Sequence, residues 1–324
     1  MDQLARVCGS LPTVTDTPPH LMRFRRGETV TEAVDRVTRE QFAIALGIAT
    51  ADTDNRARAV HSSRKAIKRL RSVLRLVRGV IAPDRYDRDN QMLKLIAAEL
   101  GGVRDAWVMA ETLNRILPAT DDTRESMAPL MTRLQRLFQI ETREVLGNDA
   151  QVASIVEQLE NVERRSRSWT VRAGSDLPLL HEFASIKPGL EQVYKRGRHG
   201  MKNAIESPTD TLLHNWRKRA KYLRHQIEAL NVLHPESLGR SEAELEMLSD
   251  LLGDDHDLAV LTNRLEDDCS LGAGIDLDGV AHAITDRRSD LQKRAVDVGA
   301  VCYSASADEF LATIRAYWVD GPAF

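Results

Sequence analysis

Two sequence motifs occur twice in this chain, in the same order and at nearly the same separation. The first motif, His-x-x-Arg-Lys-x-x-Lys-x-Leu-Arg, begins at His61 and again at His214. The second, Leu-Gly-x-x-(Arg or His)-Asp-x-x-Val, begins at Leu100 and again at Leu252. The two motifs recur at offsets of 153 and 152 residues, an agreement that is hard to obtain by chance. The repeat predicts a duplicated unit, so that both halves of the chain fold in the same way.

Few glycines and prolines interrupt the chain after residue 27, and the stretches between them carry apolar residues at helical spacing. Two such runs are Val34, Val37, Phe42 and Ala45, and Ile67, Leu70, Leu74 and Val77. Only 5% of the residues are aromatic, which disfavours a β-sandwich or barrel. We therefore expect an all-α fold of two pseudo-symmetric bundles of antiparallel helices, one from each copy of the repeat. The predicted parts are a flexible N-terminal tail over 1–27, a first bundle over 28–175 and a second bundle over 176–324.

The chain has no apolar run near the roughly 20 residues that a membrane span requires, so no membrane helix is predicted. Cys8, Cys269 and Cys302 are far apart, which leaves neither a disulfide framework nor a zinc-binding pair. The first residues lack the basic and then apolar layout of a secretory signal. Together these features predict a cytoplasmic protein without a metal or cofactor.

The formal net charge of −3 hides a strongly uneven distribution of charge. Residues 56–83 hold nine Lys or Arg and no acid, whereas residues 194–224 hold nine Lys or Arg against Glu206 and Asp210. These two segments carry +9 and +7, and the remainder of the chain carries −19. Each segment contains one copy of the first motif, so the positive charge belongs to the repeated unit.

At about 100° per residue, the basic side chains of each motif share one face of a helix, opposite its apolar face. The residues on these two faces are His61, Arg64, Lys65, Lys68, Arg71 and Arg75, and His214, Arg217, Lys218, Lys221 and Arg224. A solvated helix face usually mixes acids and bases, whereas like charges on one face repel one another. An anionic ligand that offsets this repulsion is therefore the better interpretation. A neighbouring basic row is expected from Lys195, Arg196, Arg198, His199 and Lys202.

Together the two motif pairs resemble the CHAD domain, the conserved histidine α-helical domain, from about Glu28 to the C-terminal region. The second copies, over 214–228 and 248–261, are the closer match. This resemblance implies two four-helix bundles whose basic faces line a groove that binds inorganic polyphosphate, in a stand-alone module without a fused β-rich triphosphatase-like domain. It implies phosphate contacts from Arg64, Lys65, Lys68, Arg71, Arg217, Lys218, Lys221 and Arg224. Association with polyphosphate granules would follow.

A track of Lys and Arg suits polyphosphate, which is a chain of charges with no bases to recognise. Single-stranded nucleic acid, the less favoured partner, usually stacks on aromatic side chains that lie between the basic ones. In the second copy only Tyr222 lies near the basic face, while Trp216 belongs to the core side. The aromatic content of these faces therefore favours polyphosphate.

The sharpest catalytic alternative is a metal-dependent phosphohydrolase with an HD-type site at His256 and Asp257. Such a site requires further ligands, and the first copy has Arg104 where the second has His256. We prefer a structural or groove-facing role, in which Asp105 and Asp257 cap a helix after the glycine break or orient a basic neighbour. The sequence also lacks a nucleophile motif and a Gly-rich phosphate loop, so no catalytic residues are predicted.

Overall fold

The computed structural model describes residues 21–51, 56–116, 121–146, 148–174, 177–178 and 182–321. The α-helices are α1 Val30–Leu46, α2 Arg56–Leu76, α3 Pro83–Glu99, α4 Gly102–Ile116, α5 Asp121–Leu146, α6 Asp149–Ser166, α7 Lys187–Glu206, α8 Asp210–Leu230, α9 Pro235–Asp267, α10 Cys269–Gly272, α11 Asp278–Cys302 and α12 Ala307–Asp320. Short 3-10 helices span Gly47–Ala49, Arg167–Thr170, Phe183–Ser185 and Asn231–Leu233. Within the described ranges the only β-pairing is an isolated bridge between Val171 and Pro178, and the predicted all-α class is confirmed.

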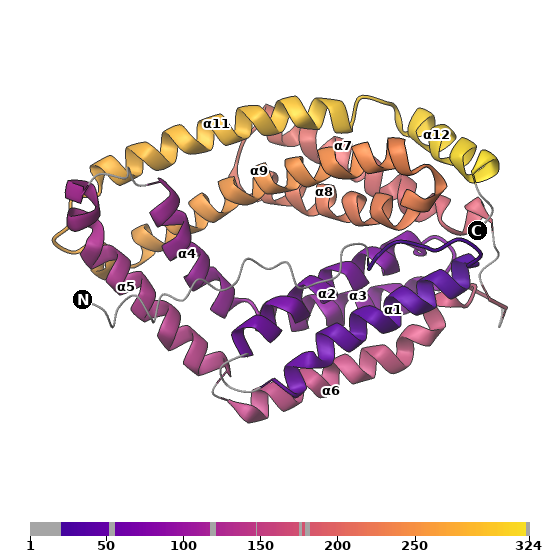
Figure 1. Ribbon diagram of the computed structural model, residues 1–324, viewed down its shortest axis with the longest axis horizontal. Coiled ribbons are helices and arrows are strands. Elements are labelled where there is room, and N and C mark those ends of the chain that lie inside the picture. Colours follow the sequence, from indigo (N-terminus) through magenta and orange to yellow (C-terminus); the bar gives the residue numbers. More distant parts are fainter. Residues whose placement is uncertain are drawn as a thin grey trace.

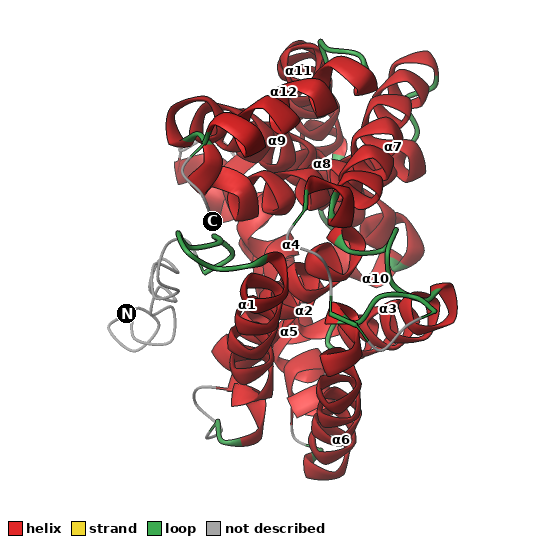
Figure 2. Cartoon of the chain, turned by 90° about the vertical axis from the view of Figure 1, so that its right-hand side faces the viewer, coloured by secondary structure: helices red, strands yellow, loops and turns green. Residues whose placement is uncertain are grey.

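The helices form two layers that lie one above the other (Figures 1 and 2). In one layer α1 packs on α2 and α6, and α3 packs on the same two helices, so these four close a ring of contacts. In the other layer α7, α8, α9 and α11 close a similar ring, and α12 packs on α7. The helices pack in a similar order in the two halves, as a duplicated unit would, although the duplication itself stays a prediction.

The positions of helices α4 and α5 do not fit an arrangement of two separate bundles. Both belong to the first half of the chain, yet α4 packs on α9 and α11, and α5 packs on α10 (Figure 1). The guanidinium of Arg133 on α5 donates to the carbonyl oxygens of Leu271, at 2.7 Å, and Ala273, at 2.9 Å. The first half is therefore tied to the second along the whole length of the molecule.

The repeated Leu-Gly motif has a different backbone in its two copies. In the first copy α3 ends at Glu99, Leu100 caps it, and α4 begins at Gly102. In the second copy Gly253 lies inside the continuous helix α9, so the predicted helix break after it is wrong. One glycine inside a helix costs about 1 kcal/mol relative to alanine, and the first copy has two in succession at Gly101 and Gly102. Two successive glycines double this cost, which helps to explain why the helix is interrupted only in the first copy.

The two layers meet where α2 packs on α8 and on α7. The buried hydroxyl of Ser72 on α2 donates to the backbone carbonyl oxygen of Tyr222 on α8, at 3.0 Å. At the start of α7, Gly189 lies so close to α2 that a Cβ atom there would collide with the carbonyl oxygens of Leu76 and Arg75. The two layers are therefore joined by contacts to backbone carbonyl oxygens, and these contacts set the spacing between α2 and α8.

The predicted N-terminal tail ends earlier than residue 27. Met22 and Phe24 are buried, and the Phe24 N–H donates to the carbonyl oxygen of Ala229 at 2.9 Å. The burial of these two side chains and the backbone bond from Phe24 to the end of α8 correct the predicted boundary, while residues 1–20 of the tail lie outside the described residues. Among the described helices, none is both long enough and apolar enough to cross a membrane.

Candidate functional site

Helices α2 and α8 carry basic side chains on both sides of their line of contact. Around the α2 axis, Arg71 and Arg75 lie about 60–100° to one side of Ser72, and Lys65 and Arg69 lie about 20–60° to the other. We call the first side the Lys218 face; it comprises Lys68, Arg71, Arg75, Asn90, Lys94, Arg196, His214, Lys218 and Arg219. We call the second side the Lys65 face; it comprises Lys65, Arg69, Arg224, His225, Glu228, Glu242 and Glu246. The sequence predicts one groove, whereas the structure distributes its cations over two faces.

The Lys218 face gathers cations from four helices. Lys218 and Arg219 come from α8, and Arg71, Lys94 and Arg196 come from α2, α3 and α7. Partial burial lowers the pKa of Lys218, and the positive charges of Arg219, Arg71 and Lys94 lower it further. The pKa of Arg219 falls for the same reasons, with Arg196 and Arg71 as its basic neighbours. The charges that act on these two side chains therefore mark a concentration of positive charge.

Arg75 is part of the support of this face. Its side chain is buried with 7% of its surface exposed, and its guanidinium lies over the ring of Tyr222, 3.9 Å from the centroid. It donates to the Arg71 carbonyl oxygen at 2.7 Å and to Asn90 Oδ1 at 2.9 Å, while Arg71 Nε donates to the same Oδ1 at 3.2 Å. The sequence groups Arg75 with the cations expected to bind the anion, but in the structure its guanidinium is held by packing partners. A neutral amide thus orients both arginines and leaves their charge intact.

The two histidines that begin the repeated motif lie in different surroundings. The His214 ring packs against the His256 ring of α9, with centroids 4.3 Å apart. Burial, followed by the charges of His256, Lys218 and other cations, lowers the pKa of His214 to about 3. His214 is therefore neutral at physiological pH, and a neutral imidazole can donate only one hydrogen bond. His61, which begins the first copy, is half-buried on α2. Lys221, in the second copy, is half-buried on α8.

Each motif arginine lies against the glycine of the second motif in its own copy. A Cβ atom on Gly101 would lie 3.3 Å from Nη1 of Arg64, and a Cβ on Gly253 would lie 3.2 Å from Nη2 of Arg217. Arg64 Nη1 also donates to the Ala97 carbonyl oxygen at 2.8 Å. In each copy the glycine of the second motif thus leaves room for the guanidinium of the first.

Carboxylates occupy the Lys65 face. Arg224 forms an ion pair of 2.7 Å with Glu246 of α9, and His225 Nδ1 lies 3.3 Å from an oxygen of the buried Glu228. Burial raises the pKa of Glu228, but the hydrogen bond with His225 and the charges of nearby cations, Arg69 included, bring it below its usual value. Glu228 is consequently ionised at neutral pH. The predicted phosphate contact Arg224 therefore already has an anionic partner.

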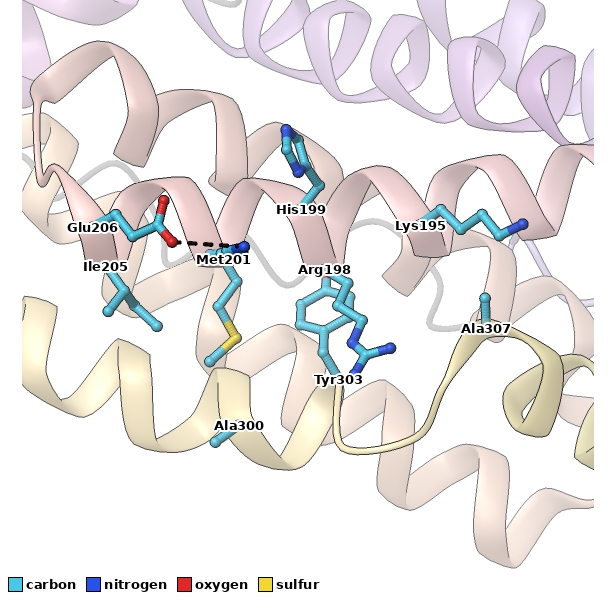
Figure 3. Close-up of a pocket in the computed structure, with 10 residues that line it drawn as sticks. Lys195, Arg198, His199, Met201, Ile205, Glu206, Ala300, Tyr303 and Ala307 are labelled. Carbon is cyan, nitrogen blue, oxygen red and sulfur yellow. Dashed lines mark ion pairs between the residues drawn. The ribbon is translucent and has the colours of Figure 1, made fainter.

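Most of the predicted basic row on α7 lies elsewhere. Lys195, Arg198, His199 and Lys202 line a pocket of about 650 Å³ between α7 and the α11–α12 region, together with Tyr303, Ala300 and Ala307 (Figure 3). Lys202 pairs with Glu206 at 3.7 Å, and Lys195 pairs with Glu191. Arg196 alone of this row acts on Arg219. The neighbouring basic row expected from the sequence is therefore divided, with four side chains at this pocket and Arg196 near Arg219, because successive residues of α7 face different neighbours.

Sequence reasoning did not place Lys94, Asn90 and Arg219 in the site. Lys94 and Asn90 lie on α3 among acids, so nothing in their own segment marks them. Arg219 falls within the basic segment but off the predicted arc of α8. The available signal was the alignment of the two copies, which pairs Asn90 and Lys94 with Glu242 and Glu246 at the offset of 152. Such a change of charge at aligned positions is visible before the structure is known.

The acidic segment before His256 has a structural role. Asp255 is buried and accepts hydrogen bonds from Arg288 Nε at 2.9 Å and Gln292 Nε2 at 2.8 Å, both on α11. Asp254 pairs with Arg115 of α4 at 2.9 Å. Over the described ranges no group of three or more His, Cys, Asp or Glu is placed to hold a metal ion. The side chains of Arg104 and Asp105, the aligned pair in the first copy, lie outside the described residues.

The fold and this site define an all-α protein of two packed helical groups with a concentration of cations where the groups meet. The chain belongs to the CHAD domain family, whose family model matches residues 31–266. Its structure is similar to the crystal structure of the CHAD domain from the plant Ricinus communis, with a TM-score of 0.51, 18% sequence identity, and coverage of 89% of this chain and 91% of that chain. No match was found among curated proteins. The family predicted from the two motif pairs is thereby confirmed.

Proposed function

We propose that this protein binds inorganic polyphosphate on the Lys218 face, without catalysis. The observation that carries the proposal is that Arg71 and Arg75 are held by the neutral Asn90 Oδ1, at 3.2 and 2.9 Å, beside Lys218, whose pKa is lowered by burial and then by the positive charges of Arg219, Arg71 and Lys94. Cations held close together raise one another's free energy, and a bound polyanion relieves this repulsion. Polyphosphate supplies about one negative charge per phosphate, so one short stretch of the chain can contact several members of the face.

The aromatic side chains near this face favour polyphosphate over single-stranded nucleic acid. Arg75 lies over the ring of Tyr222, and Arg78 lies over the ring of Tyr86 at 4.3 Å from the centroid. Trp216 is fully buried, as the sequence predicts. Because arginines already occupy the two tyrosine rings, these rings are poor platforms for the stacking of bases.

Titration of the protein with long-chain polyphosphate at two salt concentrations tests this proposal. If about six cations contact phosphates, the affinity should fall by several hundredfold to about a thousandfold between about 50 and about 200 mM salt, because binding releases counterions. Affinity that does not respond to salt would contradict the proposal. Competition with single-stranded DNA separates the two polyanions, since DNA that binds as well as polyphosphate would favour a nucleic-acid role.

The proposal includes no hydrolysis, because a surface of cations supplies neither a nucleophile nor a general base. Incubation of the protein with polyphosphate and Mg²⁺ or Mn²⁺ tests this point, and release of inorganic phosphate would favour the phosphohydrolase alternative at His256 and Asp257. A cytoplasmic location and association with polyphosphate granules would follow from binding and stay predictions.

A further inference from the structure

We propose that the Lys218 face is the binding face for polyphosphate and that the related Lys65 face, although it carries three cations, is closed to the polymer by its own glutamates. This inference rests on the proposed function and specifies which half of the predicted groove performs it. Its determinants are three positions at which the two copies of the repeat carry different charges.

The aligned positions show the difference directly. At the offset of 152, Asn90 corresponds to Glu242 and Lys94 corresponds to Glu246. At the offset of 153, Arg75 corresponds to Glu228. At each position a neutral or basic side chain on the Lys218 face is replaced by a glutamate on the Lys65 face.

The same arginine position therefore has opposite partners on the two faces. Arg71 donates to the neutral Asn90 Oδ1, whereas the aligned Arg224 forms an ion pair with Glu246. An amide orients a guanidinium without cancelling its charge, but a carboxylate both orients and neutralises it. A phosphate that approached Arg224 would have to displace Glu246, whereas one that approached Arg71 would meet an oriented and uncompensated cation.

The charges around the Lys65 face are of both signs. Burial lowers the pKa of the half-buried Lys65, and the charges of Arg69 and Arg224 lower it further. The charges of Glu228 and Arg224 both act on Arg69, and Glu242 forms an ion pair with Arg23 at 3.4 Å. Glu228 and Glu246 thus act directly on Arg69 and Arg224, while the aligned positions of the Lys218 face carry Arg75 and Lys94.

Two exposed positions allow a reciprocal test, because Lys94 and Glu246 are aligned and both side chains are accessible to solvent. Lys94→Glu gives the Lys218 face the glutamate that the Lys65 face carries at the aligned position, Glu246. The affinity for polyphosphate should then fall about tenfold or more. In Glu246→Lys the Lys65 face loses its closing acid, and a second binding event should appear. Isothermal titration calorimetry with a short polyphosphate of defined length measures both the affinity and the number of sites. Circular dichroism and thermal unfolding verify that each variant keeps its fold.

The aligned pair Lys218→Ala and Lys65→Ala provides a matched control. Lys218→Ala should weaken binding about tenfold, and Lys65→Ala should change it by less than about twofold. Equal losses in the two variants, or an unchanged number of sites in Glu246→Lys, would overturn the one-sided site while the binding function stands. A wild-type protein that does not bind polyphosphate at low salt would overturn the proposed function itself.

Discussion

The hydroxyl of Ser72 donates to the backbone carbonyl oxygen of Tyr222 across 3.0 Å, and the two residues are 150 positions apart in the chain. Both side chains are buried, and Gln226 one turn further along α8 lies against Ser72 as well, with 3.5 Å between its Nε2 and the Ser72 carbonyl oxygen. This contact joins the two helical layers. It also separates the basic surface into the Lys218 face on one side and the Lys65 face on the other.

The Ser72 contact should control both stability and binding. Ser72→Leu places a larger side chain where α2 meets α8, and overpacking of this kind costs about 1–3 kcal/mol of the unfolding free energy. Because α2 and α8 would move apart, the affinity for polyphosphate should fall together with stability. Urea unfolding and a polyphosphate titration measure the two effects. Ser62→Leu, on the half-buried surface of the same helix, serves as the control. An equal loss in the control would argue against a special role for the contact.

The two motif glycines should respond differently to alanine. A Cβ on Gly101 would lie 2.7 Å from the Ala98 carbonyl oxygen, so Gly101→Ala should lower the unfolding free energy by about 1–3 kcal/mol. Gly253 lies inside α9, where alanine gains about 1 kcal/mol of helix propensity and its Cβ would have atoms of the Arg217 guanidinium as its nearest neighbours. Gly253→Ala should therefore leave stability within about 1 kcal/mol of wild type, because the guanidinium can shift aside. Chemical unfolding of both variants checks the contrast, which equal destabilisation would refute.

The half-buried His214 should make the protein less stable in mild acid. The pKa of this imidazole is about 3 in the folded protein, whereas a solvent-exposed histidine has a pKa of about 6.5. Between these two values the unfolded chain binds a proton that the folded protein rejects, so stability should fall as the pH decreases from about 6.5, by about 1 kcal/mol per pH unit. His214→Gln should reduce this slope, and the exposed His199→Gln should leave it unchanged. Unfolding free energies measured from pH 7 to pH 4 provide the comparison, and identical slopes in all three proteins would contradict the prediction.

Asn90 should affect stability and binding in opposite directions. In Asn90→Asp the carboxylate would accept charge-assisted hydrogen bonds from Arg71 and Arg75, so the unfolding free energy should rise by up to about 1 kcal/mol. The same negative charge would neutralise part of the Lys218 face and lower the affinity for polyphosphate several-fold. The control, Gln91→Glu, adds an equal charge at an exposed neighbouring position of α3. If the control weakens binding as much as Asn90→Asp, a general effect of charge would replace the local explanation.

Helical periodicity predicted some features of the site and missed others, and the difference has a physical cause. It placed Trp216 on the core side of its helix, which the structure confirms, because a side chain's direction about its own helix axis depends only on its position in the chain. It also grouped Arg75 with the other cations, but the ring of Tyr222 from another helix covers its guanidinium. Lys94 joined the site from α3 for a similar reason: its neighbours Lys218 and Arg71 are brought near it by packing.

The helical class, the family and the existence of two basic helix faces could be predicted from the amino-acid sequence, because these depend on local spacing and on motifs that recur within one chain. The division of the cations into two unlike faces could not, because it depends on how the helices pack. Electrostatic energy depends on distances between side chains, and α3 and α9 bring Asn90 and Lys94 to one face but Glu242 and Glu246 to the other. The same motif arginine therefore stays available for an anion at Arg71 and is neutralised at Arg224.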